Sequence, residues 1–309
     1  MLEMIPEQIL EIKMKKLISA FLLIVLSATQ NVFASTREIA SCIRRTACQK
    51  TFVVAHRSNG FGAPENSREA VEKATRAGVD IIEIDVRLSK DGNIYVLHDN
   101  ALDRTTNLQG PISQKISVEL EDAILANDET LPMLQDIHDI ALGKAILNLD
   151  FKSNAIEKIV KWIAHSESFD DFIFFVDTIE EMESAAVLKT RYPEMIVMAR
   201  EKSNISLENI EKVFGTLPEI IHTDFPTKES VEYLHKKKVK VFANVLAAEK
   251  TFWPIKQLAE HWIFAYETDF IQTDYPREWL KKLKRAKKSL EKKYNFGVVY
   301  SGQLFRSRA

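Results

Sequence analysis

Eight short apolar segments, with intervening stretches mostly long enough for a helix, constrain the fold of this chain more than any other feature. Strands that alternate with helices form parallel sheets, and eight such units make a TIM-type (β/α)8 barrel, which 309 residues can easily supply. The expected strands are Phe52 to His56, Ile81 to Val86, Ala145 to Phe151, Phe172 to Val176, Ile196 to Ala199, Glu219 to His222, Val239 to Ala243 and Phe270 to Gln272. The sequence therefore predicts an α/β barrel.

A further apolar run, Ile94 to His98, does not fit the parallel pattern. It follows the second strand across Lys90-Asp91-Gly92, a connection too short for a parallel crossover. We expect a small hairpin inserted after the second strand, which folds His98 over the mouth of the barrel.

The helix after the first strand has end signals of its own. Asn66 is placed to cap its start, Glu69 completes a capping box three residues later, and Gly78 ends it.

Two histidines, an arginine and an acidic pair lie in the stretch between Phe52 and Asn107. Cleavage of a phosphodiester requires neutralisation of the phosphoryl oxygens and proton transfer on both sides of phosphorus. His56 and His98 are the candidate base and acid, and the sequence does not say which is which. Arg57 offers a planar fork that matches phosphate oxygens.

The acidic pair suits a divalent cation. Glu83 and Asp85 lie two residues apart in an expected strand, so their carboxylates point to the same side. Buried carboxylates are costly unless they are paired or bind metal, and hard oxygen ligands suit Ca²⁺ or Mg²⁺. Active sites of such barrels lie at the carboxyl ends of the strands, where His56, the acidic pair and Asp150 are expected.

These motifs resemble the glycerophosphodiester phosphodiesterase family, in its exported bacterial form. The matching segments are His56-Arg57-Ser58, Pro64-Glu65-Asn66, Glu83-Ile84-Asp85, Lys90-Asp91-Gly92, His98-Asp99, Arg104-Thr105-Thr106, Asp150-Phe151-Lys152 and Thr273-Asp274-Tyr275-Pro276. They extend from the first expected strand to the end of the last.

The resemblance implies metal-dependent hydrolysis of glycerophosphodiesters to glycerol-3-phosphate and an alcohol, with both histidines as acid/base catalysts. It assigns Asp150 to the metal site beside Glu83 and Asp85, and Lys152 to the substrate phosphate together with Arg57. Glu65 is expected to orient an imidazole or a metal-bound water.

The chain departs from the family pattern at two positions. Ser58 replaces a glycine, and its Cβ would hinder a positive φ, a freedom that Asn59, Gly60 and Gly62 can supply instead. Asp150 replaces a glutamate, which keeps the charge but shortens the reach by about 1.5 Å. Such a change shifts metal affinity or admits a water, and neither departure removes a proton-transfer group.

Residues 1–34 have the pattern of a signal peptide, with Met14 as the better start. Three lysines precede the apolar run Leu17 to Leu26, and Val32-Phe33-Ala34 is typical of a signal peptidase site. We expect cleavage after Ala34 and export to the periplasm or beyond. An uncleaved membrane anchor is the alternative, although the run is shorter than the roughly 20 residues of a spanning helix.

The remaining chain divides into an N-terminal cap at 35–50, a catalytic barrel at 51–296 and a tail at 297–309 without an assigned role. The only cysteines, Cys42 and Cys48, lie in the cap. In an oxidising compartment they should pair, which would stabilise the cap by roughly 2 kcal/mol.

Several residues allow two interpretations. Asn244 is a candidate contact for a substrate hydroxyl, while Trp253, with Phe252 and Trp262, is either core or an aromatic wall for a choline group. His222 either touches ligand or packs. Residues 279–296 form a basic amphipathic stretch, which is either the last barrel helix or a transient contact with an anionic membrane surface.

The formal net charge of −2 gives no global field for nucleic acid, so we expect a small-molecule substrate and no nucleic acid partner. Three alternatives stay open: a lysophospholipase D or sphingomyelinase D-like lipid phosphodiesterase, a noncatalytic phosphodiester-binding protein, and a structural barrel whose motifs match by coincidence. The head-group alcohol, the choice between Ca²⁺ and Mg²⁺, and the oligomeric state are open.

Overall fold

The computed structural model of the chain describes residues 35–45, 47–153, 155–166, 168–250 and 253–294. Within these ranges the side chains of 166, 253–258 and 290–294 are not described. The expected signal peptide, the tail and Phe252 therefore lie outside the described residues. None of the described helices is both long enough and apolar enough to cross a membrane.

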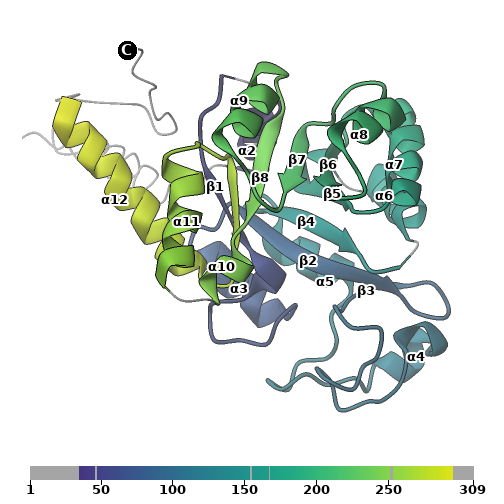
Figure 1. Ribbon diagram of the computed structural model, residues 1–309. Coiled ribbons are helices and arrows are strands. Elements are labelled where there is room, and N and C mark those ends of the chain that lie inside the picture. The colour runs from purple at the N-terminus through teal and green to yellow at the C-terminus, as the bar shows by residue number, and fades with distance from the viewer. Residues whose placement is uncertain (1–34, 46, 154, 167, 251–252, 295–309) are drawn as a thin grey trace, which may run out of the picture. The chain divides into compact units, whose positions relative to one another are not determined.

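Eight parallel strands form a closed barrel (Figure 1), as the sequence predicts. Closure is made by β1, which pairs with β2 on one side and β9 on the other. The barrel strands are β1 (Phe52–Ala55), β2 (Ile81–Leu88), β4 (Ile146–Phe151), β5 (Phe172–Val176), β6 (Ile196–Glu201), β7 (Ile220–Thr223), β8 (Lys240–Asn244) and β9 (Phe270–Thr273). All eight expected strands are present, with ends shifted by at most two residues.

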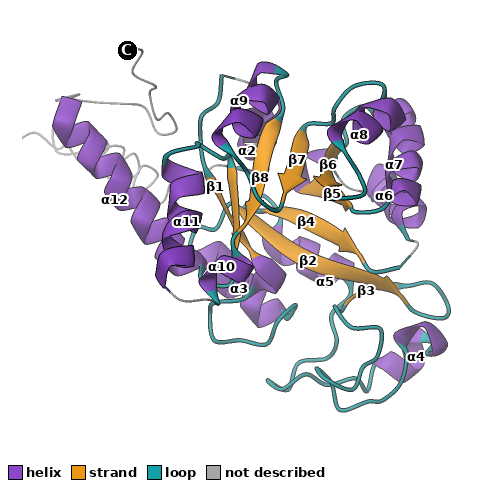
Figure 2. Cartoon of the chain, in the orientation of Figure 1, coloured by secondary structure: helices purple, strands orange, loops and turns teal. Residues whose placement is uncertain are grey.

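Helices cover the outside of the barrel (Figure 2). They bury the outward side chains of the strands, such as Ile82 and Ile84 of β2, in one large core. The long outer helices are α3 (Arg68–Arg76), α5 (Leu134–Ala141), α6 (Ile156–Ser166), α7 (Ile179–Arg191), α8 (Leu207–Phe214), α9 (Lys228–Lys236), α11 (Trp253–Phe264) and α12 (Pro276–Tyr294). The short helices are α4 (Ser117–Leu120), α10 (Leu246–Glu249), η2 (Ile112–Gln114) and η3 (Phe169–Asp171).

The amino end of the barrel is packed by α2 (Thr36–Arg44), which lies in the expected cap. Ile39 and Ile43 of this helix join inward strand residues such as Phe52 and Phe270 in a second core. Cys42 and Cys48 form a disulfide with Cα atoms 5.3 Å apart. Polar side chains are therefore left to the opposite end of the barrel, the mouth, where the strands end.

The hairpin after β2 is confirmed. β3 (Ile94–Val96) is antiparallel to β2, and the amide of Leu97 donates to the carbonyl of Asp85 at 2.9 Å. The segment that follows has a small core of its own, which includes Leu97, Leu102 and Leu120. His98 is thereby fixed next to the end of β2.

The predicted helix cap is wrong by one residue. Ser67 rather than Asn66 caps α3, because its hydroxyl accepts from the amide of Ala70 at 3.1 Å. Asn66 has a φ of 58° and its amide group is hydrogen-bonded elsewhere, to a buried carboxylate of β2. The helix does end as expected, before Gly78 at a φ of 78°.

Ser58 contradicts the expectation that a residue with a Cβ avoids a positive φ. It ends the 3-10 turn η1 (His56–Ser58) with a φ of 55°, directly after Arg57 at 51°. The buried hydroxyl of Ser58 donates to the carbonyl of Arg57 at 2.6 Å, which offsets part of the steric cost. Gly60 and Gly62 also have positive φ, so they add to this freedom rather than replace it.

Truncation of a buried side chain of α2 should destabilise the barrel. Ile39 is 1% exposed, so Ile39→Ala should lower the free energy of unfolding by about 2–5 kcal/mol through lost burial and a cavity. Val187→Ala is the matched control: this side chain on α7 is 71% exposed and the change should stay within about 0.5 kcal/mol. Urea unfolding followed by circular dichroism measures both. Equal midpoints for the two variants would show that α2 does not seal the core.

Candidate active site

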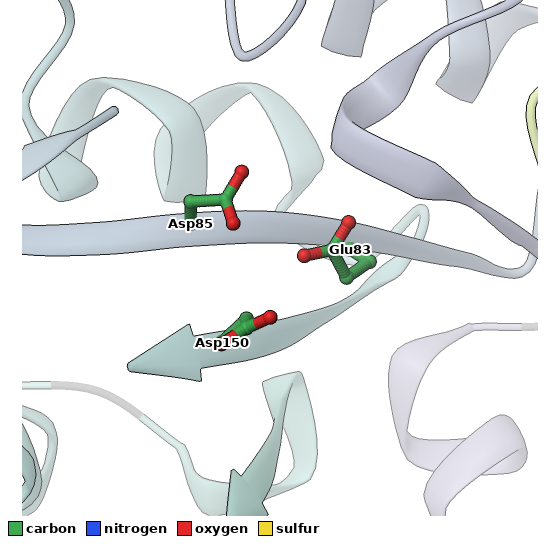
Figure 3. A group of neighbouring side chains, drawn as sticks. All are labelled: Glu83, Asp85 and Asp150. Carbon is green, nitrogen blue, oxygen red and sulfur yellow. The ribbon is translucent and has the colours of Figure 1, made fainter. Parts of the chain in front are cut away.

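Three carboxylates from two neighbouring strands meet at the mouth of the barrel (Figure 3). Glu83 and Asp85 belong to β2, and Asp150 lies opposite Asp85 in the parallel register of β4. One oxygen of each carboxylate lies within 4.8 Å of the others. The sequence predicted this cluster from the alternation of β2 and from the motif around Asp150.

The cluster concentrates negative charge where water is excluded. Burial raises the pKa of Glu83 well above its ordinary value, and the nearby carboxylates of Asp85 and Asp150 raise it further. Burial also raises the pKa of Asp150, against the opposing effect of Lys152. Three acids held this close favour a cation in their midst, because a bound positive charge removes the repulsion that raises these pKa values.

Two cationic side chains border the cluster. Lys152 Nζ lies 2.7 Å from Asp150 Oδ2 and 3.4 Å from Asp85 Oδ1. Burial lowers the pKa of Lys152, but the hydrogen bond to Asp150 and the combined attraction of Asp150, Asp85 and Glu83 outweigh it, so the pKa is raised. Arg57 donates its backbone amide to Glu83 at 2.7 Å and places Nε 3.6 Å from Asp85 Oδ2. Both predicted phosphate-binding residues thus lie beside the predicted metal ligands.

Each predicted catalytic histidine is hydrogen-bonded to an aspartate. His56 Nδ1 lies 2.8 Å from Asp274 Oδ1, and His98 Nδ1 lies 2.6 Å from Asp99 Oδ1. Burial alone would raise the pKa of Asp274, but the interactions with His56 and, to a smaller extent, Lys250 hold it at about 2. Hydrogen bonds from Arg104 and His98 lower the pKa of Asp99. An ionised carboxylate only accepts, so Nδ1 carries the proton and each neutral imidazole keeps a lone pair on Nε2.

Arginines connect the His98–Asp99 pair to the rest of the mouth. Arg104 donates to Asp99 at 2.5 Å and to Glu65 at 2.6 Å, and Glu65 also lies 3.4 Å from Arg57 Nη1. Glu65 therefore reaches His98 through Arg104 and Asp99, where the sequence predicted that it orients an imidazole or a metal-bound water. Both arginines contribute to the lowered pKa of Glu65, against the effect of burial.

Sequence reasoning missed the positions of three supporting residues. Asn66 donates to Asp85 Oδ2 at 2.9 Å, where it was expected to cap a helix. Arg87 binds the carbonyl of His98 at 2.6 Å and that of Lys152 at 2.7 Å, so it joins the hairpin to β4. Asp274 was matched as part of a motif but given no role. The Pro-Glu-Asn and Thr-Asp-x-Pro motifs were the available signals for Asn66 and Asp274.

Other predicted mouth residues have local partners. Asn244 ends β8, and its Oδ1 accepts from the amide of Leu246 at 3.0 Å, a turn-capping contact. Trp253 begins α11, but its side chain lies outside the described residues. His222 is buried between the rings of Phe175 and Phe242, and burial lowers its pKa to about 3. His222 is thus a neutral packing residue of the inner barrel.

The chain is similar to proteins of one known family. Residues 56–278, more than half of the chain, match the model of the glycerophosphoryl diester phosphodiesterase family. A relative from Caldanaerobacter subterraneus, named glycerophosphodiester phosphodiesterase, is 34% identical over 128 residues. That match covers 37% of this chain and spans about half of the relative, 53%.

Solved structures share the fold. A glycerophosphoryl diester phosphodiesterase from Parabacteroides distasonis has a TM-score of 0.68 at 23% identity, covering 82% of this chain and 93% of that one. A phosphodiesterase from Oleispira antarctica, in complex with the product sn-glycerol-3-phosphate, has a TM-score of 0.61 at 24% identity, covering 76% and 97%. With the family match over the barrel and its mouth, the chain belongs to the glycerophosphoryl diester phosphodiesterase family.

Proposed function

We propose that this protein hydrolyses glycerophosphodiesters to glycerol-3-phosphate and an alcohol. The observation that carries the proposal is the arrangement at the mouth: two aspartate-held imidazoles beside a cluster of three carboxylates. The family match and the product complex of the Oleispira relative support this substrate class.

The carboxylate cluster fits one divalent cation. Two oxygens that bind the same ion are at most about 4.6–5.2 Å apart for Ca²⁺ and about 4.0–4.2 Å apart for Mg²⁺. The ligand oxygens of Glu83, Asp85 and Asp150 lie within 4.8 Å of one another, which is within the range for Ca²⁺, and we propose Ca²⁺ as the cation. When bound, such a cation would draw negative charge from the phosphoryl oxygens and lower the barrier to attack at phosphorus.

The chain's own side chains would supply binding and proton transfer. Lys152 and Arg57 would bind the phosphate, and the position of their charged groups beside the three carboxylates supports this role. His56 and His98, each with Nε2 unprotonated in the neutral ring, would share the proton transfers. One would take a proton from the attacking hydroxyl, while the other, as imidazolium, would protonate the departing alcohol.

We also propose that the protein acts outside the cytoplasm. Two observations support export: the signal-peptide pattern of residues 1–34, and the disulfide between Cys42 and Cys48, a bond that persists in oxidising compartments.

Turnover is the direct test of the proposed activity. The metal-stripped protein should release no glycerol-3-phosphate from glycerophosphocholine or glycerophosphoethanolamine, and Ca²⁺ should restore release better than Mg²⁺. His56→Ala should lower kcat/KM by about 10²- to 10⁴-fold, because a proton-transfer group is lost.

The controls separate the alternatives. Inductively coupled plasma spectrometry should show that His56→Ala retains the cation, since the imidazole is not among the carboxylate ligands. A protein that binds both substrates without turnover under every metal would be the noncatalytic binder. Turnover of lysophosphatidylcholine alone would indicate the lipid phosphodiesterase.

Neutralising the aspartate behind each histidine should slow the reaction without abolishing binding. Asp274→Asn and Asp99→Asn should each lower kcat by about 10²- to 10⁴-fold, since the amide no longer stabilises the imidazolium, and should change KM little. Lys250→Ala is the control, because this lysine lies 3.2 Å from Asp274 but is 64% exposed. Its loss should lower kcat by less than about fivefold.

The pKa of Asp274, at about 2, means that the wild-type pH–rate profile should show no step from this carboxylate above pH 4. If Asp274→Asn retained full kcat, the His56–Asp274 pair would have no role in turnover.

The length of residue 150 should set cation affinity. Asp150→Asn removes one of three anionic ligands and should weaken Ca²⁺ binding at least tenfold, an effect that chelator competition measures directly. Asp150→Glu keeps the charge and adds reach towards Glu83 and Asp85, so it should bind Ca²⁺ at least as tightly as the wild type. Unchanged affinity in Asp150→Asn would place the cation elsewhere.

A further inference from the structure

The outward face of α12 carries a line of four cations. Lys281, Lys284, Arg285 and Lys288 follow the i, i+3, i+4, i+7 spacing of one helix face and are all exposed. We call these four residues the basic stripe. It extends about 10 Å along the helix axis.

The opposite face of α12 is committed to the barrel. Trp279 is buried, and Leu280 and Leu283 pack against the core that it joins. The indole of Trp279 also donates to Glu249 at 2.7 Å. Because this face is fixed against the protein, the basic stripe must point to solvent.

The basic stripe has no acidic partner in the described part of the chain, whereas its neighbour does. Lys282 lies on the flank of α12, where its Nζ is 2.7 Å from Glu260 and 4.6 Å from the ring of Trp279. Glu278, the acid of the first turn, lies three residues before Lys281, but no ion pair joins these two described side chains. Four positive charges without an ion-pair partner on one helix face repel one another, and an anionic partner would relieve that repulsion.

We propose that the basic stripe docks the protein on an anionic phospholipid surface. Long, flexible cationic side chains on one helix face can reach a flat surface together. Three of the four are lysines, which act as point charges towards phosphate without demanding a fixed geometry. The stripe contains no aromatic side chain on which a base could stack, so a bilayer fits it better than a nucleic acid.

The basic stripe is separate from the mouth. α12 begins at Pro276, two residues after Asp274, and leads away from the carboxyl end of β9 (Figure 1). Docking through its outward face therefore engages none of the residues that would bind substrate, and turnover of a soluble diester should not depend on it.

Partition of the full chain into vesicles tests the proposal. Lipid titration gives one partition coefficient for vesicles of phosphatidylcholine alone and another for vesicles that also contain phosphatidylglycerol. The ratio of the two cancels any contribution from other parts of the chain that bind both lipids. In the variant Lys281→Gln, Lys284→Gln, Arg285→Gln and Lys288→Gln, this ratio should fall at least about tenfold, and high salt should abolish it in the wild type.

Two further variants complete the design. Lys115→Gln, Lys161→Gln and Lys237→Gln remove three scattered charges, each paired with a glutamate, and should leave the ratio nearly unchanged. Lys281→Arg, Lys284→Arg and Lys288→Arg keep the positive charge and should preserve the ratio. Release of alcohol from glycerophosphocholine should be equal in all variants. An unaltered ratio in the glutamine variant would overturn the proposal, as would tighter binding of the wild type to duplex DNA than to phosphatidylglycerol vesicles at the same salt.

Discussion

The site depends on the parallel register between β2 and β4. That register sets Asp85 opposite Asp150, and the period of two along β2 adds Glu83 on the same side. Backbone hydrogen bonds between two neighbouring strands thus hold three carboxylates together, although burial and their mutual repulsion raise the pKa of Glu83. The pairing of the strands therefore holds the carboxylates together against their electrostatic repulsion, which is typical of a site that is formed before its ligand binds.

The residues around the three carboxylates supply hydrogen-bond donors to them. Asn66, Lys152 and the backbone amide of Arg57 each contact one of the three carboxylates. Arg57 reaches its position only because η1 turns through two residues with positive φ, one of which is Ser58. The hydrogen bond from the Arg57 amide to Glu83 offsets the backbone strain at this turn.

The barrel and most of the site follow from local sequence, but the supporting contacts do not. Apolar runs and the spacing between them located all eight strands, because burial inside a parallel sheet leaves a local signature. The partner of His56 lies 218 residues away, and no local rule can find such a pair. The role of Asn66 was predicted wrongly for the same reason. An asparagine side chain can cap a helix or bind a buried carboxylate equally well, and only the fold shows that Ser67 caps α3 while Asn66 binds Asp85.

The net charge of the whole chain is also a poor guide to the charge of one surface. The net charge of −2 argues against a global field, yet α12 presents four exposed cations on one face without an ion-pair partner in the described part of the chain. A potential near a surface depends on charges within about 10 Å at physiological salt, so the sum over the whole chain does not describe it. The helix that seals the barrel with Trp279 and Leu283 therefore fixes the direction of its lysines as well. Packing on one face and the proposed attraction on the other would both follow from a single amphipathic pattern, so they are not competing interpretations of it.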